Sequence, residues 1–302
     1  MTSRMTTMQP SNPRFAFFGT PYVAKDTLAA LVDAGYIPAV VITSPDKHQG
    51  RGLTLTPCPT KAWALEHHLP VITPEKLTHE AISDIKEYGC EYALVVAYGK
   101  ILPESLIHSF PKGVLNVHYS LLPKYRGASP VEAALLNGDT VTGVSIQKMV
   151  KELDAGDVLT SREVAIDPDE TTRELRPRLI EEGARLLIDS LPAFIRGTAS
   201  FTPQDESQAT KCGKIAKESG ELTFPGDPLG NWNKYRAYAE SPGTYFYMIR
   251  DGKRFRVKVK SAEFKHGHFT PLRVVPEGKK EMDYAALTMT ARPLYENERE
   301  AL

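Results

Sequence analysis

Residues 15–21 read Phe-Ala-Phe-Phe-Gly-Thr-Pro, and this stretch gives the first indication of the fold class of the N-terminal part of the chain. Four apolar residues in a row are typical of a short buried strand, and Gly19-Thr20-Pro21 ends the run with a turn. Residues 22–35 then place apolar side chains at helical spacing and stop at Gly35, which can serve as a helix C-cap. The stretch therefore predicts a buried strand, a turn and a helix in immediate succession.

The same alternation continues for about another hundred residues. Further short apolar runs predict strands, and segments of helical spacing lie between them. Because alternating strands and helices form βαβ units, we predict an α/β domain with a Rossmann-like, mostly parallel sheet. Open sheets of this kind bind ligands at the carboxyl ends of their strands. The further predicted strands are 39–42, 71–72, 92–97 and 113–118, and the further predicted helices are 60–68 and 78–88.

A different pattern follows the long amphipathic helix that we predict for residues 171–196. Strand-like segments dominate the C-terminal part, and Asp251-Gly252 between two of them is typical of a hairpin turn. We predict a small antiparallel, OB-like β-barrel, with an open sheet as the alternative. The predicted strands are 244–249, 254–259 and 269–275.

A length of 302 residues suits two domains better than one. The N-terminus is polar and no apolar run of 18 residues occurs, so we expect a soluble, cytoplasmic protein without a signal peptide or membrane span. We separately expect a monomer. The predicted parts are a disordered tail (1–13), a catalytic domain (14–197), a linker rich in Gln, Ser and Thr (198–210) and a C-terminal domain (211–302).

The chain carries no net charge, but its charges are unevenly distributed. Residues 1–205 hold 20 Lys and Arg against 24 Asp and Glu, whereas residues 206–302 hold 17 against 13. A positive C-terminal part can meet a polyanion, and a solvated charged surface is the alternative. The three cysteines are widely spaced, which excludes a disulfide framework and a Cys-rich zinc site and fits a reducing compartment.

The densest group of chemically useful residues lies between Asn116 and Asp157. Asn116 and His118 are two positions apart in a predicted strand, so their side chains point to the same side, at the strand's end. Asp154 follows in the turn Leu-Asp-Ala-Gly-Asp. An Asn amide can hold an oxyanion, a His can transfer a proton near neutral pH, and an Asp can orient the imidazole or accept a proton. The structural alternative is that the His caps or packs and that the Asn and Asp only form turns.

Other reaction types find less support in the sequence. No Ser or Cys stands beside a base in a nucleophile-elbow setting, and neither a His-Glu-x-x-His motif nor a metal-spaced His cluster occurs. We therefore expect direct attack by a substrate amine rather than a covalent acyl-enzyme, and no metal. These residues alone indicate an α/β enzyme, with acyl-group transfer as one candidate reaction.

Two segments stand out for their basic residues. The loop from Ser44 to Pro59 holds Lys47 and Arg51, and it is either functional or a structureless surface loop. In residues 253–260 charged and apolar residues alternate, so a strand would place its basic residues on one face, where they could follow a phosphate backbone. A solvated edge strand is the alternative. The basic residues of this row are Arg254, Arg256, Lys258 and Lys260.

The segment Asn-Val-His-Tyr-Ser-Leu-Leu-Pro-Lys-Tyr-Arg-Gly-Ala-Ser-Pro at 116–130, with Asp154 after it, resembles the 10-formyltetrahydrofolate-dependent formyltransferases. The resemblance implies that the acceptor amine attacks the formyl carbon on the folate N10. It implies that Asn116 and His118 stabilise the oxyanion and that Asp154 assists proton transfer. It also implies 10-formyltetrahydrofolate as the donor, bound by Ser120, Leu121, Leu122 and Pro123 and by Ala97, Tyr98 and Gly99.

Members of this family differ in the amine that they formylate, and this chain resembles the transfer-RNA branch. The resemblance implies initiator methionyl-tRNA as the acceptor, a role in translation initiation, and tRNA contacts by Lys47 and Arg51. The basic row adds an independent argument for a tRNA contact. The alternatives are a sugar-nucleotide N-formyltransferase, a formyltetrahydrofolate hydrolase, and a non-catalytic RNA-binding protein on the same scaffold. The segments that carry this resemblance are 17–21 with 44–52, 214–222 and 276–282.

Overall fold

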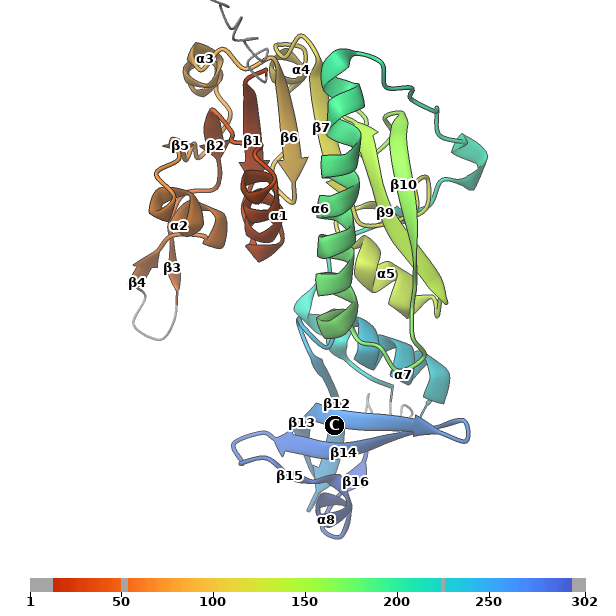
Figure 1. Ribbon diagram of the computed structural model, residues 1–302. Helices are drawn as coiled ribbons and strands as arrows, with labels where there is room; N and C mark the ends of the chain where they lie inside the picture. Colours follow the sequence, from red (N-terminus) through yellow and green to blue (C-terminus); the bar gives the residue numbers. More distant parts are fainter. Residues whose placement is uncertain (1–12, 50–53, 224–225, 295–302) are drawn as a thin grey trace, which may run out of the picture. The chain divides into compact units, whose positions relative to one another are not determined.

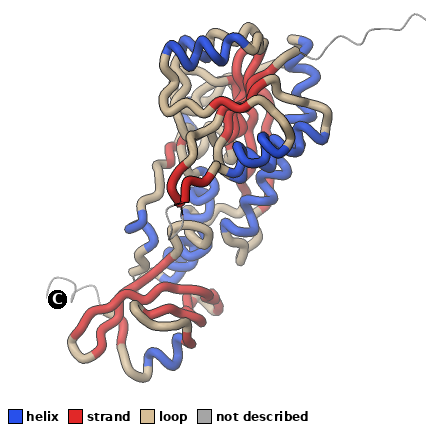
Figure 2. Tube along the Cα trace, turned by 90° about the vertical axis from the view of Figure 1, so that its left-hand side faces the viewer, coloured by secondary structure: helices blue, strands red, loops and turns tan. Residues whose placement is uncertain are grey.

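The computed structural model describes residues 13–49, 54–223 and 226–294 (Figure 1), so Arg51 and nearly all of the predicted N-terminal tail lie outside it. The described chain folds into two compact units, whose helices, strands and loops are distinguished in Figure 2. The first unit contains the residues up to Pro123 together with Val144–Arg162 and Ile180–Ser207. The second contains Lys124–Gly143, Glu163–Leu179 and the residues from Gln208 onward.

A seven-stranded sheet forms the main scaffold, with the order β10-β9-β7-β6-β1-β2-β5. The five strands from β7 to β5 are parallel, and β9 runs antiparallel to β7. This confirms the predicted Rossmann-like, mostly parallel sheet. The bounds are β1 Phe15–Gly19, β2 Val40–Ile42, β5 Val71–Ile72, β6 Tyr92–Val96, β7 Gly113–His118, β9 Val141–Lys148 and β10 Val158–Ala165.

The helices that connect these strands start and stop where the sequence provides caps. Gly35 has a φ of 85° just after the first helix, and the Thr78 hydroxyl accepts a hydrogen bond from the Ala81 amide at the start of the third. The four predicted helices are confirmed as α1 Tyr22–Asp33, α2 Pro59–Glu66, α3 His79–Glu87 and α6 Thr172–Arg196. The short helices α4 Glu104–Ile107, α5 Pro130–Leu136, α7 Pro228–Ala237 and α8 Tyr284–Thr288 were not predicted.

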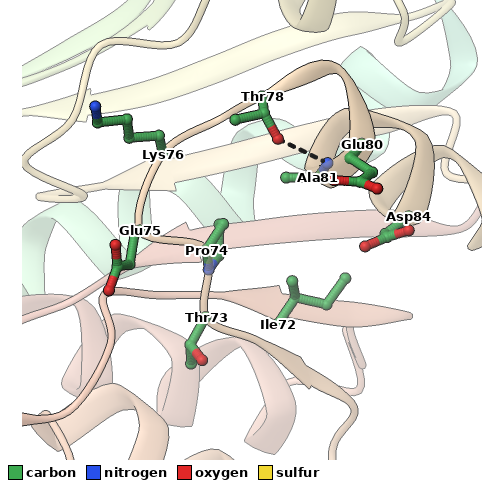
Figure 3. Close-up of a pocket in the computed structure, with 9 residues that line it drawn as sticks. All are labelled: Ile72, Thr73, Pro74, Glu75, Lys76, Thr78, Glu80, Ala81 and Asp84. Atoms are coloured by element: carbon green, nitrogen blue, oxygen red, sulfur yellow. Dashed lines mark hydrogen bonds between the residues drawn. The ribbon is translucent and has the colours of Figure 1, made fainter.

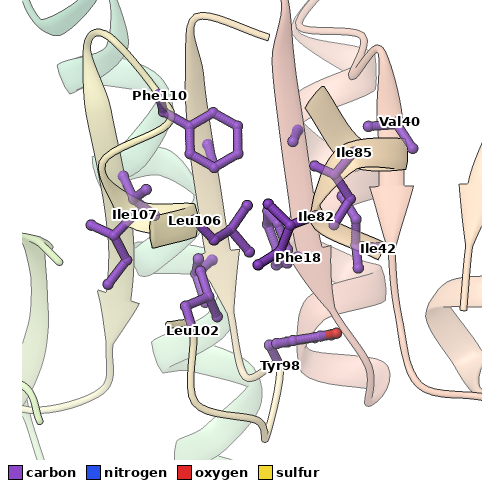
Figure 4. Close-up of a cluster of buried hydrophobic side chains, with 14 residues drawn as sticks. Phe18, Val40, Ile42, Ile82, Ile85, Tyr98, Leu102, Leu106, Ile107 and Phe110 are labelled. Atoms are coloured by element: carbon purple, nitrogen blue, oxygen red, sulfur yellow. The ribbon is translucent and has the colours of Figure 1, made fainter. Parts of the chain in front are cut away.

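A continuous apolar cluster fills one side of the parallel sheet (Figure 4). Phe18 of β1 contacts Phe110 edge-on, and Leu106 of α4 is fully buried beside them. Burying a side chain of this size stabilises the fold by about 2 kcal/mol. The parallel strands β1, β2, β5 and β6 consist of apolar and aromatic residues, so the polar side chains that could carry the chemistry come from other parts of the sheet.

The predicted loop from Ser44 to Pro59 contains an antiparallel hairpin. Its strands are β3 Lys47–Gln49 and β4 Thr54–Thr56, with Lys47 paired to Thr56. The Lys61 ammonium group lies 2.7 Å from the Asp46 carboxylate at the base of the hairpin. The segment is therefore not structureless, and its base is fixed to α2.

The second unit contains a five-stranded antiparallel sheet with the order β15-β14-β13-β12-β16. Asp251 and Gly252 form the hairpin turn, both with positive φ, as predicted. Because β13 lies between β12 and β14, the interpretation of the basic row as an edge strand is wrong. The bounds are β12 Thr244–Arg250, β13 Lys253–Lys265, β14 His268–Pro276, β15 Met282–Asp283 and β16 Arg292–Pro293, and a small separate pair is β8 Arg126–Gly127 with β11 Lys211–Cys212.

Candidate functional site

Asn116 and His118 lie at the carboxyl end of β7, between the parallel strand β6 and the antiparallel strand β9. Val117, between them, points towards α6, because a Cβ atom on Gly183 of that helix would come within 3.2 Å of its Cγ1 atom. The side chains of Asn116 and His118 therefore point to the opposite side of the sheet. His118 is buried and Asn116 is half-buried.

Asp154 lies next to His118, although the two residues are far apart in sequence. Its Oδ2 atom is 3.6 Å from the imidazole Nδ1, and both side chains are largely shielded from water. At this distance the carboxylate stabilises positive charge on the imidazole whenever the ring takes up a proton. The structure thus brings the predicted Asn, His and Asp together at one strand end.

The turn that presents Asp154 is held by two glutamines. Gln147 of β9 donates from Nε2 to Oδ1 of Asp154 over 2.9 Å. Gln204 donates to the backbone carbonyls of Asp154 and Gly156, over 2.9 and 2.7 Å. Asp154 itself has a φ of 52°, and a Cβ atom on Gly156 would collide with the Lys148 carbonyl. These contacts over-determine the turn, and Gln204 shows that the predicted linker is partly packed against the first unit.

The loop after β7 is fixed by a serine that sequence reasoning missed. The Ser145 hydroxyl of β9 donates to the Ser120 carbonyl over 2.7 Å and accepts from the Leu122 amide over 3.1 Å. Ser120 is fully buried, whereas Leu121, Leu122 and Pro123 are half-buried. Ser145 and Gln147 are two positions apart and flank the apolar Ile146 in β9, and that spacing is the signal that could have revealed them.

The segment Ala97–Gly99 leaves β6 beside this loop. Ala97 and Gly99 are exposed and both have positive φ, so their backbone groups are accessible. The Tyr98 ring instead points into the apolar cluster (Figure 4), where it meets Phe18 edge-on. Burial raises the pKa of Tyr98 to about 12, so its phenol is neutral at physiological pH. The three residues therefore offer backbone, not an aromatic ring, at the strand end.

The basic row on β13 alternates as predicted. Arg254, Arg256, Lys258 and Lys260 are exposed, whereas Val257 and Val259 are buried. Two tyrosines of β12, missed from the sequence, lie on the same face, because Tyr245 pairs with Lys258 and Tyr247 with Arg256.

Cation–π contacts join these rings to the row. The guanidinium carbon of Arg254 is 3.6 Å from the Tyr247 ring centroid, and that of Arg256 is 5.3 Å from the Tyr245 centroid. Burial raises the pKa of Tyr245, which keeps its ring neutral beside these cations. The face therefore combines exposed positive charge with partly ordered arginines. In the first unit, Lys47 is exposed on β3.

A cavity of about 520 Å³ lies between β5 and α3 and contains none of the predicted site residues (Figure 3). Its lining includes the carboxylates of Glu75, Glu80 and Asp84, and the Lys100 ammonium group donates to the Pro74 and Glu75 carbonyls at its edge. Within the described ranges, no cluster of three or more His, Cys, Asp or Glu could hold a metal ion, and no helix is long and apolar enough to cross a membrane.

Comparison with known proteins gives a consistent family. Residues 13–191, more than half of the chain, match the family described as formyl transferase. The chain is 41% identical over 250 residues to the methionyl-tRNA formyltransferase of Bdellovibrio bacteriovorus, covering 82% of this chain and 78% of that protein.

Solved structures share the fold at lower identity. The methionyl-tRNA formyltransferase of Clostridium thermocellum superimposes with a TM-score of 0.57 at 17% identity, over 89% of this chain and 98% of that one. An N-formyltransferase of Helicobacter canadensis, solved with folinic acid and dTDP-3-aminofucose, superimposes with a TM-score of 0.61 at 17% identity, over 84% and 89%.

Proposed function

The chain belongs to the methionyl-tRNA formyltransferases of the formyl transferase family, and from this premise we propose which of its residues carry out the reaction. The reaction is transfer of a formyl group to the amino group of methionyl-tRNA. The single observation that carries the assignment of residues is the meeting of Asn116, His118 and Asp154 at the end of β7, within the part that matches the family. The sugar-nucleotide and hydrolase alternatives have less support, since the relatives at about 40% identity over most of the chain are methionyl-tRNA enzymes, whereas the N-formyltransferase solved with an amino-sugar nucleotide is only 17% identical.

The proposed chemistry uses these three side chains around one formyl carbon. The methionyl amine attacks that carbon, and the Asn116 amide and His118 donate hydrogen bonds to the oxyanion that develops. Asp154 accepts a proton from the attacking nitrogen, directly or through His118, and the proton passes to the departing folate nitrogen as its bond to carbon breaks. Positioning and charge stabilisation supply the catalysis, without a covalent enzyme intermediate.

The donor is proposed to be 10-formyltetrahydrofolate, and the residues at the strand ends fit a reduced folate. The exposed backbone at Ala97 and Gly99 offers hydrogen-bonding groups for the polar edge of a pteridine. The half-buried side chains of Leu121 and Leu122, on a loop fixed by Ser145, offer an apolar surface for its ring. Ser120 is proposed to act through its backbone, because its side chain is fully buried.

Initiator tRNA is proposed to bind through the β12–β13 face and the β3–β4 hairpin. Four exposed cations in a row on one strand suit a phosphate backbone, and each neutralised phosphate adds roughly one unit to the salt dependence of binding. Lys47 and Arg51 would supply the contact from the hairpin. The domain boundaries 14–197 and 211–302, joined by 198–210, belong to the same proposal.

The test is an acceptor assay with purified protein and 10-formyltetrahydrofolate. Charged initiator methionyl-tRNA, free methionine and an amino-sugar nucleotide are offered separately, and formyl products are quantified at two salt concentrations. We expect product with the tRNA alone, falling as salt rises. Product with the amino sugar, or formate release without any acceptor, would overturn the proposed acceptor while leaving the catalytic residues in place.

A further inference from the structure

Gln147 lies between two of the proposed catalytic residues and is almost completely buried. It stands directly opposite Asn116 in the antiparallel β7–β9 pairing and is 2% exposed. Its Nε2 atom donates to Oδ1 of Asp154 over 2.9 Å. Its Oε1 atom is buried and has no hydrogen-bond partner in the part of the chain that the structure describes.

A buried amide oxygen without a partner destabilises the folded protein, because it has lost its hydrogen bonds to water. An apolar side chain of similar length would fill the same space without the unpaired oxygen, and it would lose only the hydrogen bond to Asp154. Such unpaired groups concentrate at functional sites, where the partner arrives with the substrate or with a side-chain rearrangement. The arrangement therefore points to a use for Oε1 that the unliganded protein does not display.

Directly opposed residues in an antiparallel pair have Cβ atoms about 5 Å apart, so the amides of Gln147 and Asn116 are within reach of each other. An Asn amide carries two N–H groups. If one N–H is donated to Oε1 of Gln147, the other is left in a defined direction for the oxyanion. The same glutamine then holds Asp154 with its own N–H, so that Oδ2 faces His118.

We propose that Gln147 is a positioning residue that couples Asn116 to Asp154. Its N–H orients the Asp154 carboxylate. Its carbonyl oxygen accepts a hydrogen bond from an N–H of Asn116 when the formyl donor and methionyl-tRNA are bound. This inference rests on the proposed roles of Asn116, His118 and Asp154. Gln147 touches no reacting atom, so it affects turnover by aligning groups rather than by binding substrate.

The test replaces Gln147 by Met, and in parallel by Leu, so that the result does not depend on one side chain. Steady-state formyl transfer to methionyl-tRNA is measured together with Tm. We expect kcat to fall at least about tenfold, since small misalignments have effects of this size, with KM for both substrates unchanged. We expect Tm to change little, because removal of the unpaired buried oxygen offsets loss of the hydrogen bond from Nε2 to Asp154.

Gln204→Met is the matched control, because Gln204 holds the same turn through two backbone carbonyls. That variant should lose Tm and activity together. If Gln147→Met lost kcat and also lost as much Tm as Gln204→Met, Gln147 would be only structural and the proposal would be overturned. Unchanged kcat would also overturn it.

A double-mutant comparison addresses the coupling. Gln147→Met in an Asn116→Ala background should reduce kcat less than in the wild-type background, because the two residues act through each other. If Gln147→Met lowered kcat by the same factor in both backgrounds, the proposed contact between Gln147 and Asn116 would be contradicted. His118→Ala is assayed alongside these variants. If His118→Ala keeps full activity, the proposed catalytic site itself is wrong. If His118→Ala is inactive and Gln147→Met is fully active, only the role of Gln147 is rejected.

Discussion

The catalytic strand end of the first unit and the β12–β13 face of the second use polar residues in opposite ways. At the end of β7, few polar groups are present, they are buried or half-buried, and His118 has a specific partner in Asp154. On β13, four cations repeat at every second position and remain exposed. Charges interact strongly where water is excluded and weakly where solvent and salt screen them.

Substitutions in the two regions should therefore have different effects on rate and on affinity. Removing one buried group takes away a contact that no neighbour replaces, so the rate of formyl transfer should fall steeply while tRNA binding is unchanged. Removing one exposed cation leaves three others, so affinity should decline by a modest factor that salt can mimic.

His118→Ala should lower kcat by about a thousandfold, because it removes both an oxyanion donor and a proton-transfer group. The affinity for methionyl-tRNA should be unchanged, since His118 is buried and belongs to the chemistry. Single-turnover formylation and filter binding of tRNA measure the two quantities on the same preparation. A variant that lost tRNA affinity with its rate intact would remove the contrast between the regions.

Lys258→Ala should weaken tRNA binding by roughly tenfold at low salt and reduce the slope of log affinity against log salt by about one unit. Its kcat at saturating tRNA should match the wild type. Lys86→Ala is the control, because Lys86 is an exposed lysine on α3, outside both proposed tRNA contacts. If the salt dependence of tRNA affinity fell equally in Lys258→Ala and Lys86→Ala, overall charge rather than the β13 row would govern tRNA binding.

Tyr247→Leu should weaken tRNA binding by about twofold to fivefold, because an exposed cation–π contact contributes about 0.5–1 kcal/mol to ordering Arg254. Tyr247→Phe keeps the ring and should bind like the wild type. The same assay in an Arg254→Ala background should show no further effect of Tyr247→Leu. A persistent effect there would indicate that the ring contacts RNA on its own.

Tyr98→Phe should leave formyl transfer within about twofold of the wild type, because the Tyr98 ring packs in the core. The folded phenol keeps its proton to about pH 12, whereas an unfolded one loses it near pH 10. The folded state therefore binds more protons in that window, and stability falls as pH rises through it. Denaturant unfolding at pH 8 and pH 11 should show a smaller alkaline loss in Tyr98→Phe, and a tenfold loss of activity would place the hydroxyl at the folate instead.

Much of the scaffold could be predicted because its signals are local. The strands β1, β2, β5, β6 and β7 are short apolar runs, and buried parallel strands have that composition. The side chains of Asn116 and His118 could be assigned to one side from strand geometry alone.

The rest depends on contacts between distant segments. The strand β9 was not predicted, because Ser145 and Gln147 are polar yet buried and so break the apolar pattern. The approach of Asp154 to His118, and the anchoring of the 120–122 loop by Ser145, follow from the antiparallel pairing of β9 with β7. The hairpin β3–β4 is short and polar, so it has no hydrophobic periodicity to reveal it.

The most direct test of the separation between chemistry and binding compares His118→Ala with the triple variant Arg254→Ala, Arg256→Ala and Lys258→Ala. Single-turnover formylation at saturating tRNA and tRNA affinity at two salt concentrations are measured for both. We predict that His118→Ala binds tRNA normally but does not formylate it. The triple variant should formylate at the normal rate but bind tRNA weakly, with a flatter salt dependence. Normal binding by the triple variant, or normal formylation by His118→Ala, would contradict it.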